Sequence, residues 1–345
     1  MRVLVTGNMG YIGSVLVQYL GTNAPHIQIE GFDCGFFAHC ITSREPIPEI
    51  RLVRQHFGDM RDFPAASLEN IDAVVHLAGI SNDPIGTKFE AVTEDINSRC
   101  TLKLARLAKE YGVKHFVFAS SCSLYGASGE GERSERDTLN PLTAYARSKA
   151  SSEHGLQEIA GHGLQITALR FSTACGMSPR LRLDLVLNDF VAAAVLKREI
   201  KIMSDGTPWR PLIDVQDIAR AIEWALERDG EDFLAINVGS KERNHQVHDL
   251  AEAVARAIPG TRISINHDAT PDKRSYRVDF SLFKKVAPKH QPQRTLEESI
   301  ESLKKGIEKS HIIDPDFHQS RFIRLKVLET HIAEQRLSSD LRWIS

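Results

Sequence analysis

The first twenty residues constrain the fold of this chain more than any other stretch. A mostly apolar run, Arg2–Thr6, leads into the segment Gly-Asn-Met-Gly-Tyr-Ile-Gly, which opens an amphipathic stretch, Tyr11–Leu20. Glycines at such a junction permit a tight turn, close approach of the backbone to a diphosphate, and close packing of helix on strand. The helix N-terminus adds free N–H groups and a positive dipole end. The sequence therefore predicts a dinucleotide-binding turn formed by Gly7, Met9, Gly10, Tyr11, Ile12 and Gly13.

A carboxylate follows at the distance that such a turn requires. Asp33 directly follows the apolar run Gln28–Phe32 and lies 20 residues after Gly13. An acidic residue at this place accepts hydrogen bonds from the ribose of an adenosine. Because a carboxylate repels a 2′-phosphate, Asp33 favours NAD(H) over NADP(H). Two alternatives stay open: Arg44 could serve a 2′-phosphate, and a glycine-rich turn can occur without any ligand.

Short apolar runs alternate with helical periodicity through the first half of the chain. Runs rich in β-branched and aromatic residues are typical of strands that are buried on both faces of a parallel sheet. Their alternation with amphipathic stretches implies right-handed βαβ units. We therefore predict an α/β fold with a doubly wound parallel (Rossmann) sheet. The expected strands include Arg2–Thr6, Gln28–Phe32, Ala73–Leu77, His115–Ala119 and Leu164–Arg170, and the expected helices include Tyr11–Leu20, Val92–Tyr111 and Ala144–Ile159.

The pattern becomes less regular after residue 170, which indicates a second, smaller lobe built from discontinuous pieces. Helices are expected at Leu185–Leu196 and Val215–Glu227, and a strand at Ala235–Val238. We assign residues 1–170 and about 208–240 to a dinucleotide-binding domain, and about 171–207 and 241–310 to a substrate-binding lobe. Residues 311–345 are charged and are expected to form a helical C-terminal extension.

Composition excludes several classes of partner. Hydrophobic residues make up 42% and charged residues 26%, with a net charge of −2, so we expect neither a nucleic acid nor an anionic membrane as partner. No run approaches the roughly 18 apolar residues of a membrane span. The five cysteines form no Cys-x-x-Cys pair, which favours free thiols in a reducing compartment. A cytoplasmic location is the expectation, and the N-terminus is typical of a strand rather than a secretory signal.

Two further strand ends are expected to border the cofactor, since ligands bind at the carboxyl ends of such strands. Asp59 follows the apolar run Arg51–Gln55 and is placed to contact an adenine edge, although an ordinary turn aspartate is nearly as good an explanation. The small residues after Ala73–Leu77 leave room for a ligand. This reasoning adds Asp59, Met60, Leu77, Ala78 and Gly79 to the predicted cofactor residues.

A tyrosine and a lysine four residues apart carry the expected chemistry. Tyr145 and Lys149 lie at i and i+4 of a predicted helix, so the phenol and the ammonium share one face. Tyrosine has an ordinary pKa of about 10, too high for a base at neutral pH. A neighbouring cation, together with an oxidised nicotinamide, is expected to bring the Tyr145 pKa toward neutrality. A surface Tyr–Lys pair is the structural alternative.

The serines after His115–Ala119 strengthen the catalytic interpretation. Ser121 lies at the same edge of the sheet, where its hydroxyl can hydrogen-bond the substrate oxygen that Tyr145 protonates or deprotonates. The alternative is that these serines only satisfy backbone groups at the end of the strand.

Taken in order, Gly7, Gly10 and Gly13, then Asp33, Ser121 and the Tyr145/Lys149 pair resemble the extended short-chain dehydrogenase/reductase superfamily, in its nucleotide-sugar epimerase/dehydratase branch. The resemblance covers about residues 1–305. It implies that Tyr145 is the base, that Lys149 holds the nicotinamide ribose and lowers the tyrosine pKa, and that Ser121 is the catalytic hydroxyl. It also implies that Asn97 lies on the helix beside the cofactor.

The same resemblance suggests the residues that grip a nucleotide-diphosphate sugar. The segment Asp205–Val215 resembles the family segment whose arginine binds the diphosphate, which gives Arg210 that role. Guanidinium groups suit phosphate oxygens, although a surface ion pair is an equal alternative for Arg274. The predicted substrate residues are Ser121, Ser123, Thr173, Arg180, Arg182, Arg210 and Arg274.

Departures from the family pattern narrow the reaction. Dehydratases of the family carry Asp-Glu directly after the catalytic hydroxyl, and decarboxylases carry a glutamate where this chain has Ser123; here Cys122 and Ser123 follow Ser121. The spacing of Cys122 from Tyr125 also argues against 3,5-epimerisation. Thr173 stands where many 4-epimerases have an asparagine, so the grip on the substrate is expected to differ.

Three functional hypotheses result. The first is redox-neutral epimerisation of a nucleotide-diphosphate sugar through a keto intermediate, with NAD regenerated in the site. The second is a net NAD(H)-dependent ketoreductase or dehydrogenase on a nucleotide sugar. The third is a non-catalytic dinucleotide sensor, against which the intact Tyr145/Lys149 pair argues. Pairing of helices 92–111 and 144–159 across a two-fold axis is common in relatives, so a homodimer is predicted. His245 and His248 are interpreted as a surface pair at a helix start, and no metal is expected.

Overall fold

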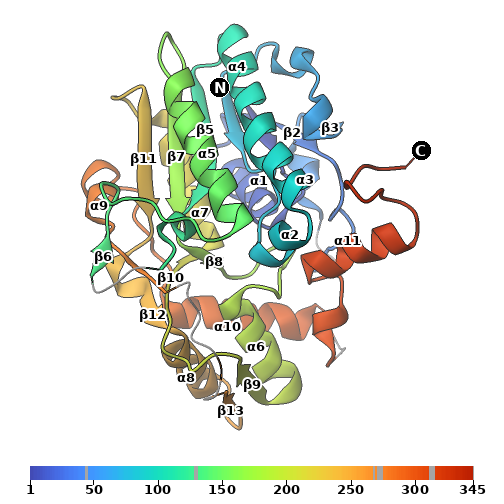
Figure 1. Cartoon of the computed structure of the whole chain (residues 1–345), viewed down its shortest axis with the longest axis vertical. Helices are drawn as coiled ribbons and strands as arrows, with labels where there is room; N and C mark the ends of the chain where they lie inside the picture. The colour runs from blue at the N-terminus through green and yellow to red at the C-terminus, as the bar shows by residue number, and fades with distance from the viewer. Residues whose placement is uncertain (43–45, 128–130, 267–268, 270–274, 311–314, 345) are drawn as a thin grey trace.

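A seven-stranded parallel sheet forms the frame of the protein (Figure 1). The computed structural model describes residues 1–42, 46–127, 131–266, 269, 275–310 and 315–344. The strand order is β11-β7-β5-β4-β1-β2-β3, and every neighbouring pair is parallel. This confirms the doubly wound fold predicted from the sequence. The strands are β1 (Arg2–Thr6), β2 (Gln28–Asp33), β3 (Arg54–Phe57), β4 (Ala73–His76), β5 (His115–Ser121), β7 (Gln165–Phe171) and β11 (Phe233–Val238).

Helices cover both faces of the sheet, and the side chains of the strands alternate between them. On β1, Val3 and Val5 pack with the helices of one face, whereas Leu4 belongs to the apolar cluster of the other. A strand has a side-chain period of two, so burial on both faces explains its nearly continuous apolar sequence. One face carries α1 (Tyr11–Asn23) and α7 (Val215–Glu227), and the other carries α4 (Cys100–Glu110) and α5 (Ala144–Ile159).

The helix predicted over residues 92–111 is present, but it begins at Glu90 and contains a π-helical turn that the sequence did not indicate. The structure has α2 (Asp83–Lys88), α3 (Glu90–Glu94), a π-helical turn at Asp95–Arg99 and then α4. The turn contains Asn97, which is fully buried and whose side chain bonds the loop after β4 instead of pointing to solvent. Such π-helical turns are rare and often lie at functional sites.

The lower part of the molecule in Figure 1 is built from α6, α8 and α10 with the strands β9 and β13. These helices pack on one another, and their apolar side chains belong to the same cluster that lies under α1 and α7. One contiguous core therefore joins this part to the sheet. The remaining elements are β6 (Glu132–Arg133), β8 (Thr173–Cys175), α6 (Val186–Lys197), β9 (Glu199–Ile202), β10 (Trp209–Asp214), β12 (Asn244–Gln246), α8 (Val247–Ala257), β13 (Arg262–Ile265), β14 (Arg277–Val278), α9 (Ser281–Val286), α10 (Leu296–Lys309) and α11 (Arg324–Ala333).

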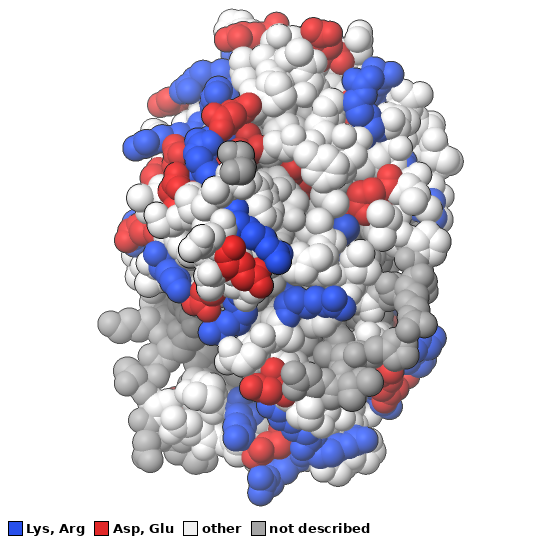
Figure 2. All heavy atoms as spheres, turned by 90° about the vertical axis from the view of Figure 1, so that its right-hand side faces the viewer, with Lys and Arg blue, Asp and Glu red and all other residues white. Residues whose placement is uncertain are grey.

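The C-terminal extension is helical over only part of its described length, in contrast to the prediction. After α11 the chain turns without further helix, and Leu337 forms an isolated bridge with Trp343. The segment returns to the sheet side of the molecule, where the Trp343 indole donates to the Cys34 carbonyl at 2.6 Å. On the face shown in Figure 2, Lys and Arg side chains are interspersed with Asp and Glu. Among the described residues, no helix is both long and apolar enough to cross a membrane.

A buried ion pair ties helix α5 to strand β7 behind the carboxyl edge of the sheet. The Arg170 guanidinium donates to both Glu153 carboxylate oxygens, at 2.6 to 3.1 Å, and both side chains are almost completely buried. Ser120 also donates to Glu153, and Arg170 donates to the Tyr125 hydroxyl. Because every member has a partner, the network fixes α5 relative to β5 and β7.

We expect Glu153→Gln to lower the free energy of unfolding by about 3–5 kcal/mol, because the change leaves the Arg170 guanidinium buried without a counter-charge. Urea denaturation followed by circular dichroism measures the loss. The matched control is Glu158→Gln on the same helix, where the carboxylate is 71% exposed and paired only with His154. That control should change stability by less than about 0.5 kcal/mol. Equal effects of the two changes would contradict the role of the buried pair.

Candidate active site

The carboxyl ends of the parallel strands border a cavity of about 920 Å³. It lies at the ends of β1 and β4, the neighbouring strands at which the order of the strands along the chain reverses. Doubly wound sheets bind their ligands at this place. Its lining continues past the end of β5 to β9 and β10. The sequence-predicted residues that line it are Gly7, Gly10, Tyr11, Ile12, Gly13, Asp33, Asp59, Met60, Leu77, Ala78, Gly79, Ser121, Ser123, Tyr145, Lys149, Thr173, Arg182 and Arg210.

The glycine turn has no room for side chains. Gly7 has a φ of +74°, and a Cβ there would lie 2.6 Å from the Ala78 amide nitrogen. A Cβ at Gly13 would collide with the Gly7 carbonyl oxygen and with Asn8. Gly10 caps α1 with no side-chain hydrogen bond to the helix N-terminus. An open helix N-terminus behind a backbone-lined cradle suits a diphosphate, so this turn fits the dinucleotide predicted from the sequence.

Asp33 is fixed by the backbone on both sides. Its carboxylate accepts from the Gly35 amide at 2.7 Å and from the Met9 amide at 3.0 Å. Burial raises the pKa of Asp33, while these two hydrogen bonds oppose the increase. Met9 does not line the cavity, in contrast to the prediction, because its side chain is buried and only its amide serves the site.

Asp59 lines the cavity but is already paired. Arg61 donates to both of its carboxylate oxygens. Burial alone would raise the pKa of Asp59, but the hydrogen bonds from Arg61 lower it by more, so the pKa lies below its ordinary value. The Arg61 guanidinium also donates to the carbonyls of Asp340 and Leu341. Asp59 therefore joins the cofactor end of the cavity to the C-terminal segment, which the sequence did not indicate.

Ser121 and Tyr145 meet at the centre of the cavity. Ser121 ends β5 and accepts a hydrogen bond from the Ser123 amide, while Tyr145 lies in the first turn of α5. Thr143 caps this helix by accepting from the Ala146 amide, and its hydroxyl donates to Asp83. The Ser121 hydroxyl lies close enough to the phenol to lower its pKa. The strand end and the helix start thus bring together the two hydroxyls that the sequence paired.

Lys149 lies one turn along α5, with its ammonium 4.6 Å from the Phe118 ring centroid and 5.8 Å from that of Tyr145. Burial lowers the pKa of Lys149 to about 8, with Glu153 opposing the shift. Burial likewise raises the pKa of Tyr145 to about 12, with the Ser121 hydroxyl opposing the shift. The protein's own groups therefore do not bring the Tyr145 pKa toward neutrality. The expectation also counted an oxidised nicotinamide, so a Tyr145 pKa near neutrality stays a prediction for the cofactor-bound site, and burial of the phenol opposes it.

Asn97 and Arg180 do not line the cavity, in contrast to the prediction. Asn97 accepts from the Ile80 amide and donates to the Ile80 carbonyl and to Ser148, so it braces the loop after β4 against α5. Arg180 is 1% exposed and donates to Glu49 at 2.7 Å. The polar groups of both side chains form hydrogen bonds within the protein, so these residues support the wall of the cavity without lining it.

The other predicted arginines differ in their surroundings. Arg182 lines the cavity and donates to Asp184 through Nε and Nη2 and to the Ser81 hydroxyl. Arg210, on β10, lines the cavity at the side of the lower lobe. Arg274 lies outside the residues that the structure describes, as does Arg44.

Sequence reasoning missed Tyr276 as a cavity residue. It is 6% exposed, packs with Cys122 and Tyr125, and lines the cavity. The sequence could have indicated Tyr276 by its position two residues after Arg274, which was already a predicted substrate residue. His318, Ile323 and Arg324 of the C-terminal extension also line the cavity, and no motif pointed to them.

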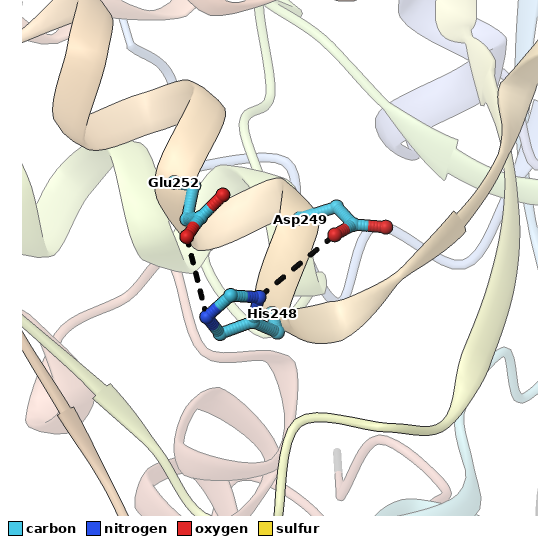
Figure 3. Close-up of side chains that lie close together, drawn as sticks. All are labelled: His248, Asp249 and Glu252. Atoms are coloured by element: carbon cyan, nitrogen blue, oxygen red, sulfur yellow. Dashed lines mark ion pairs between the residues drawn. The ribbon is translucent and has the colours of Figure 1, made fainter.

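His248, in the first turn of α8 (Val247–Ala257), lies beside two carboxylates of the same helix. Figure 3 shows His248 with Asp249 and Glu252, and the two imidazole nitrogens face different carboxylates, at 3.8 and 3.4 Å. All three side chains are about half exposed on the first turns of α8. This arrangement is that of ion pairs on a helix surface.

Lys149→Met is expected to stabilise the cofactor-stripped protein by up to about 3 kcal/mol near pH 7, since burial disfavours the ammonium. Between the folded pKa of about 8 and the ordinary value of 10.5, the unfolded chain binds more protons than the native one. Wild-type stability therefore rises with pH in this window, and the advantage of the variant shrinks. Urea denaturation near pH 7 and near pH 9.5 measures both. The exposed Lys285→Met is the control, and a gain independent of pH would refute the buried-charge explanation.

A family model described as the NAD dependent epimerase/dehydratase family matches residues 3–239. The chain is 29% identical over 252 residues to a Bacillus subtilis (strain 168) protein named as an uncharacterized UDP-glucose epimerase, YtcB, which covers 70% of this chain and 78% of that protein. It is 29% identical over 236 residues to UDP-glucuronate 4-epimerase of Thermodesulfobacterium geofontis, covering 67% and 71%. The structure of MoeE5 in complex with UDP-glucuronic acid and NAD superposes with a TM-score of 0.77 at 26% identity, over 90% of this chain and 100% of that one. This chain belongs to the NAD-dependent epimerase/dehydratase family, enzymes of the extended short-chain dehydrogenase/reductase type.

Proposed function

We propose that this protein epimerises a nucleotide-diphosphate sugar by transient oxidation to a keto sugar, with Tyr145 as the acid/base. The observation that carries the proposal is the juxtaposition of Ser121 and Tyr145 in the lining of the cavity. The glycine cradle and Arg210, which is suited to a diphosphate, line the same cavity. NAD⁺ bound in the cradle supplies a hydride acceptor that can return the hydride to either face of the keto sugar.

Each residue of the pair has a defined task. Tyr145 takes the hydroxyl proton of the sugar carbinol as the ketone forms and returns it when the ketone is reduced. Ser121 hydrogen-bonds the same oxygen and holds it beside the phenol. A phenol with a pKa of about 12 requires added positive charge to act as a base, and an oxidised nicotinamide bound in the cradle would supply that charge.

The residues after Ser121 support epimerisation over dehydration. Eliminating water needs a further acid and base beside the reacting carbons. Cys122 is fully buried, and its thiol donates to the Arg170 carbonyl, while burial raises the pKa of that thiol. The cavity carboxylates Asp83 and Asp184 accept from Thr143 and Arg182, respectively. Epimerisation needs only the one acid/base that Tyr145 supplies.

Tyr145→Phe is expected to lower kcat for epimerisation by about 10²–10⁴-fold, because the general acid/base is lost. Purified protein is incubated with nucleotide-diphosphate sugars without added cofactor, and the products are separated by chromatography. Wild-type protein should give the epimer and release about one NAD per chain on denaturation. The exposed Tyr111→Phe serves as control. Turnover that requires added NADH would instead identify a ketoreductase, and full activity of Tyr145→Phe would remove Tyr145 from the mechanism.

Asp33→Ala is expected to weaken NAD binding at least about ten-fold, because a charge-assisted hydrogen bond to the ribose is worth about 1.5–3 kcal/mol. The same change removes the repulsion of a 2′-phosphate, so the preference for NAD over NADP should fall. Calorimetry with both dinucleotides measures the two affinities. The exposed Asp229→Ala is the control. An unchanged ratio of the two affinities would contradict the role of Asp33 in discrimination.

A further inference from the structure

Residues 315–344, the described part of the C-terminal segment, contribute to the lining of the cavity and contact α6, α2 and the segment after β3. His318 contacts Asp189 of α6 at 2.7 Å, and both line the cavity. Glu329 of α11 pairs with Lys88 of α2, beside which α11 lies in Figure 1. Beyond α11, Arg342 pairs with Asp62 at the cofactor end. These contacts hold α11 in place beside the cavity.

Arg324, the first residue of α11, brings a buried guanidinium to the lining of the cavity. It is 2% exposed and lines the cavity. Two of its N–H groups donate to main-chain carbonyls, of Arg180 at 2.8 Å and of Arg321 at 3.3 Å. Its guanidinium carbon lies 4.8 Å from the Phe37 ring centroid. Among the described residues no carboxylate forms an ion pair with it.

The carboxylates near Arg324 are engaged by other groups. Arg180 pairs with Glu49, and Arg182 pairs with Asp184. Asp33, the other carboxylate of this region, accepts from two backbone amides. Arg180 and Arg182 therefore each have a carboxylate partner in direct contact, whereas Arg324 donates to neutral main-chain carbonyls. A buried charge without a counter-ion costs several kcal/mol, so a fold retains one only where something offsets that cost.

The location of Arg324 within its helix adds to the positive potential around its guanidinium. Cations are unfavourable at a helix N-terminus, where the dipole is positive, yet Arg324 occupies the first position of α11. Ile323 caps the helix with no side-chain hydrogen bond, and it too lines the cavity. A guanidinium beside an uncapped helix N-terminus is an arrangement that binds phosphate oxygens.

We propose that Arg324 and the N-terminus of α11 bind a diphosphate oxyanion of the ligand in the cavity, so that the C-terminal segment completes the binding site. The inference rests on the proposed function, which puts two diphosphates in this cavity. Contact of Arg324 with Phe37 and Arg180, near the loop that follows Asp33, favours the dinucleotide diphosphate. The sugar-nucleotide diphosphate is the second source of the same chemistry.

The test uses full-length, cofactor-stripped protein and calorimetric titration with NAD and, separately, with UDP. Arg324→Met should weaken binding of one of these probes at least about ten-fold, because a charge-assisted contact is lost. Loss with NAD identifies the dinucleotide as the source, and loss with UDP identifies the sugar nucleotide. Arg321→Met, an exposed arginine of the same segment, should bind both probes like the wild type. Unchanged affinity of Arg324→Met for both probes would overturn the inference.

Arg324→Lys keeps the test decisive if Arg324→Met does not fold. It retains the charge and loses the planar fork, so its affinity should fall by less than that of Arg324→Met while remaining salt-dependent. An affinity of Arg324→Lys equal to that of the wild type at every salt concentration would count against a fork-like phosphate contact. Wild-type protein that binds neither probe would contradict the proposed function itself, which separates the two failures.

Discussion

The close approach of two backbones, at Gly7 after β1 and at Ala78 after β4, is the constraint on which the rest of the site depends. A Cβ at Gly7 would collide with the backbone of Leu77 and Ala78, and one at Gly13 would collide with the Gly7 carbonyl oxygen and with Asn8. With both absent, α1 begins directly over the sheet edge and its N-terminus opens into the cavity. The positions of Asp33, Ser121 and Tyr145 are useful only because this edge is accessible to a ligand.

Burial acts on the two key titratable groups in the same sense. It favours the neutral phenol of Tyr145 and the neutral amine of Lys149, which places their pKa values at about 12 and about 8. Keeping an ammonium next to a phenol in an apolar setting therefore lowers the stability of the fold. The Glu153–Arg170 network behind Lys149 limits that cost, because its carboxylate opposes the shift of the lysine pKa.

Sequence reasoning identified the parts of the site that depend on local pattern. The predictions of the glycine turn, Asp33 and the Tyr145/Lys149 pair follow from spacing along the chain, and Gly7, Gly10, Gly13, Asp33, Tyr145 and Lys149 all line the cavity. It failed where the answer depended on distant partners. Arg180 and Asn97 looked available in the sequence, but Glu49 and Ile80 bind their side chains. The charge of Lys149 was counted correctly, yet the burial of Tyr145 depends on elements that no local motif describes.

The apolar core that joins the sheet to α6, α8 and α10 has a consequence for how ligands enter and leave. Two bodies that share one dry interior cannot swing apart without exposing it to water, so wide hinge opening carries a large penalty. The rim of the cleft, by contrast, is held by hydrogen bonds and ion pairs at the surface. Exchange therefore proceeds by local release of these peripheral contacts, while the interior keeps its shape.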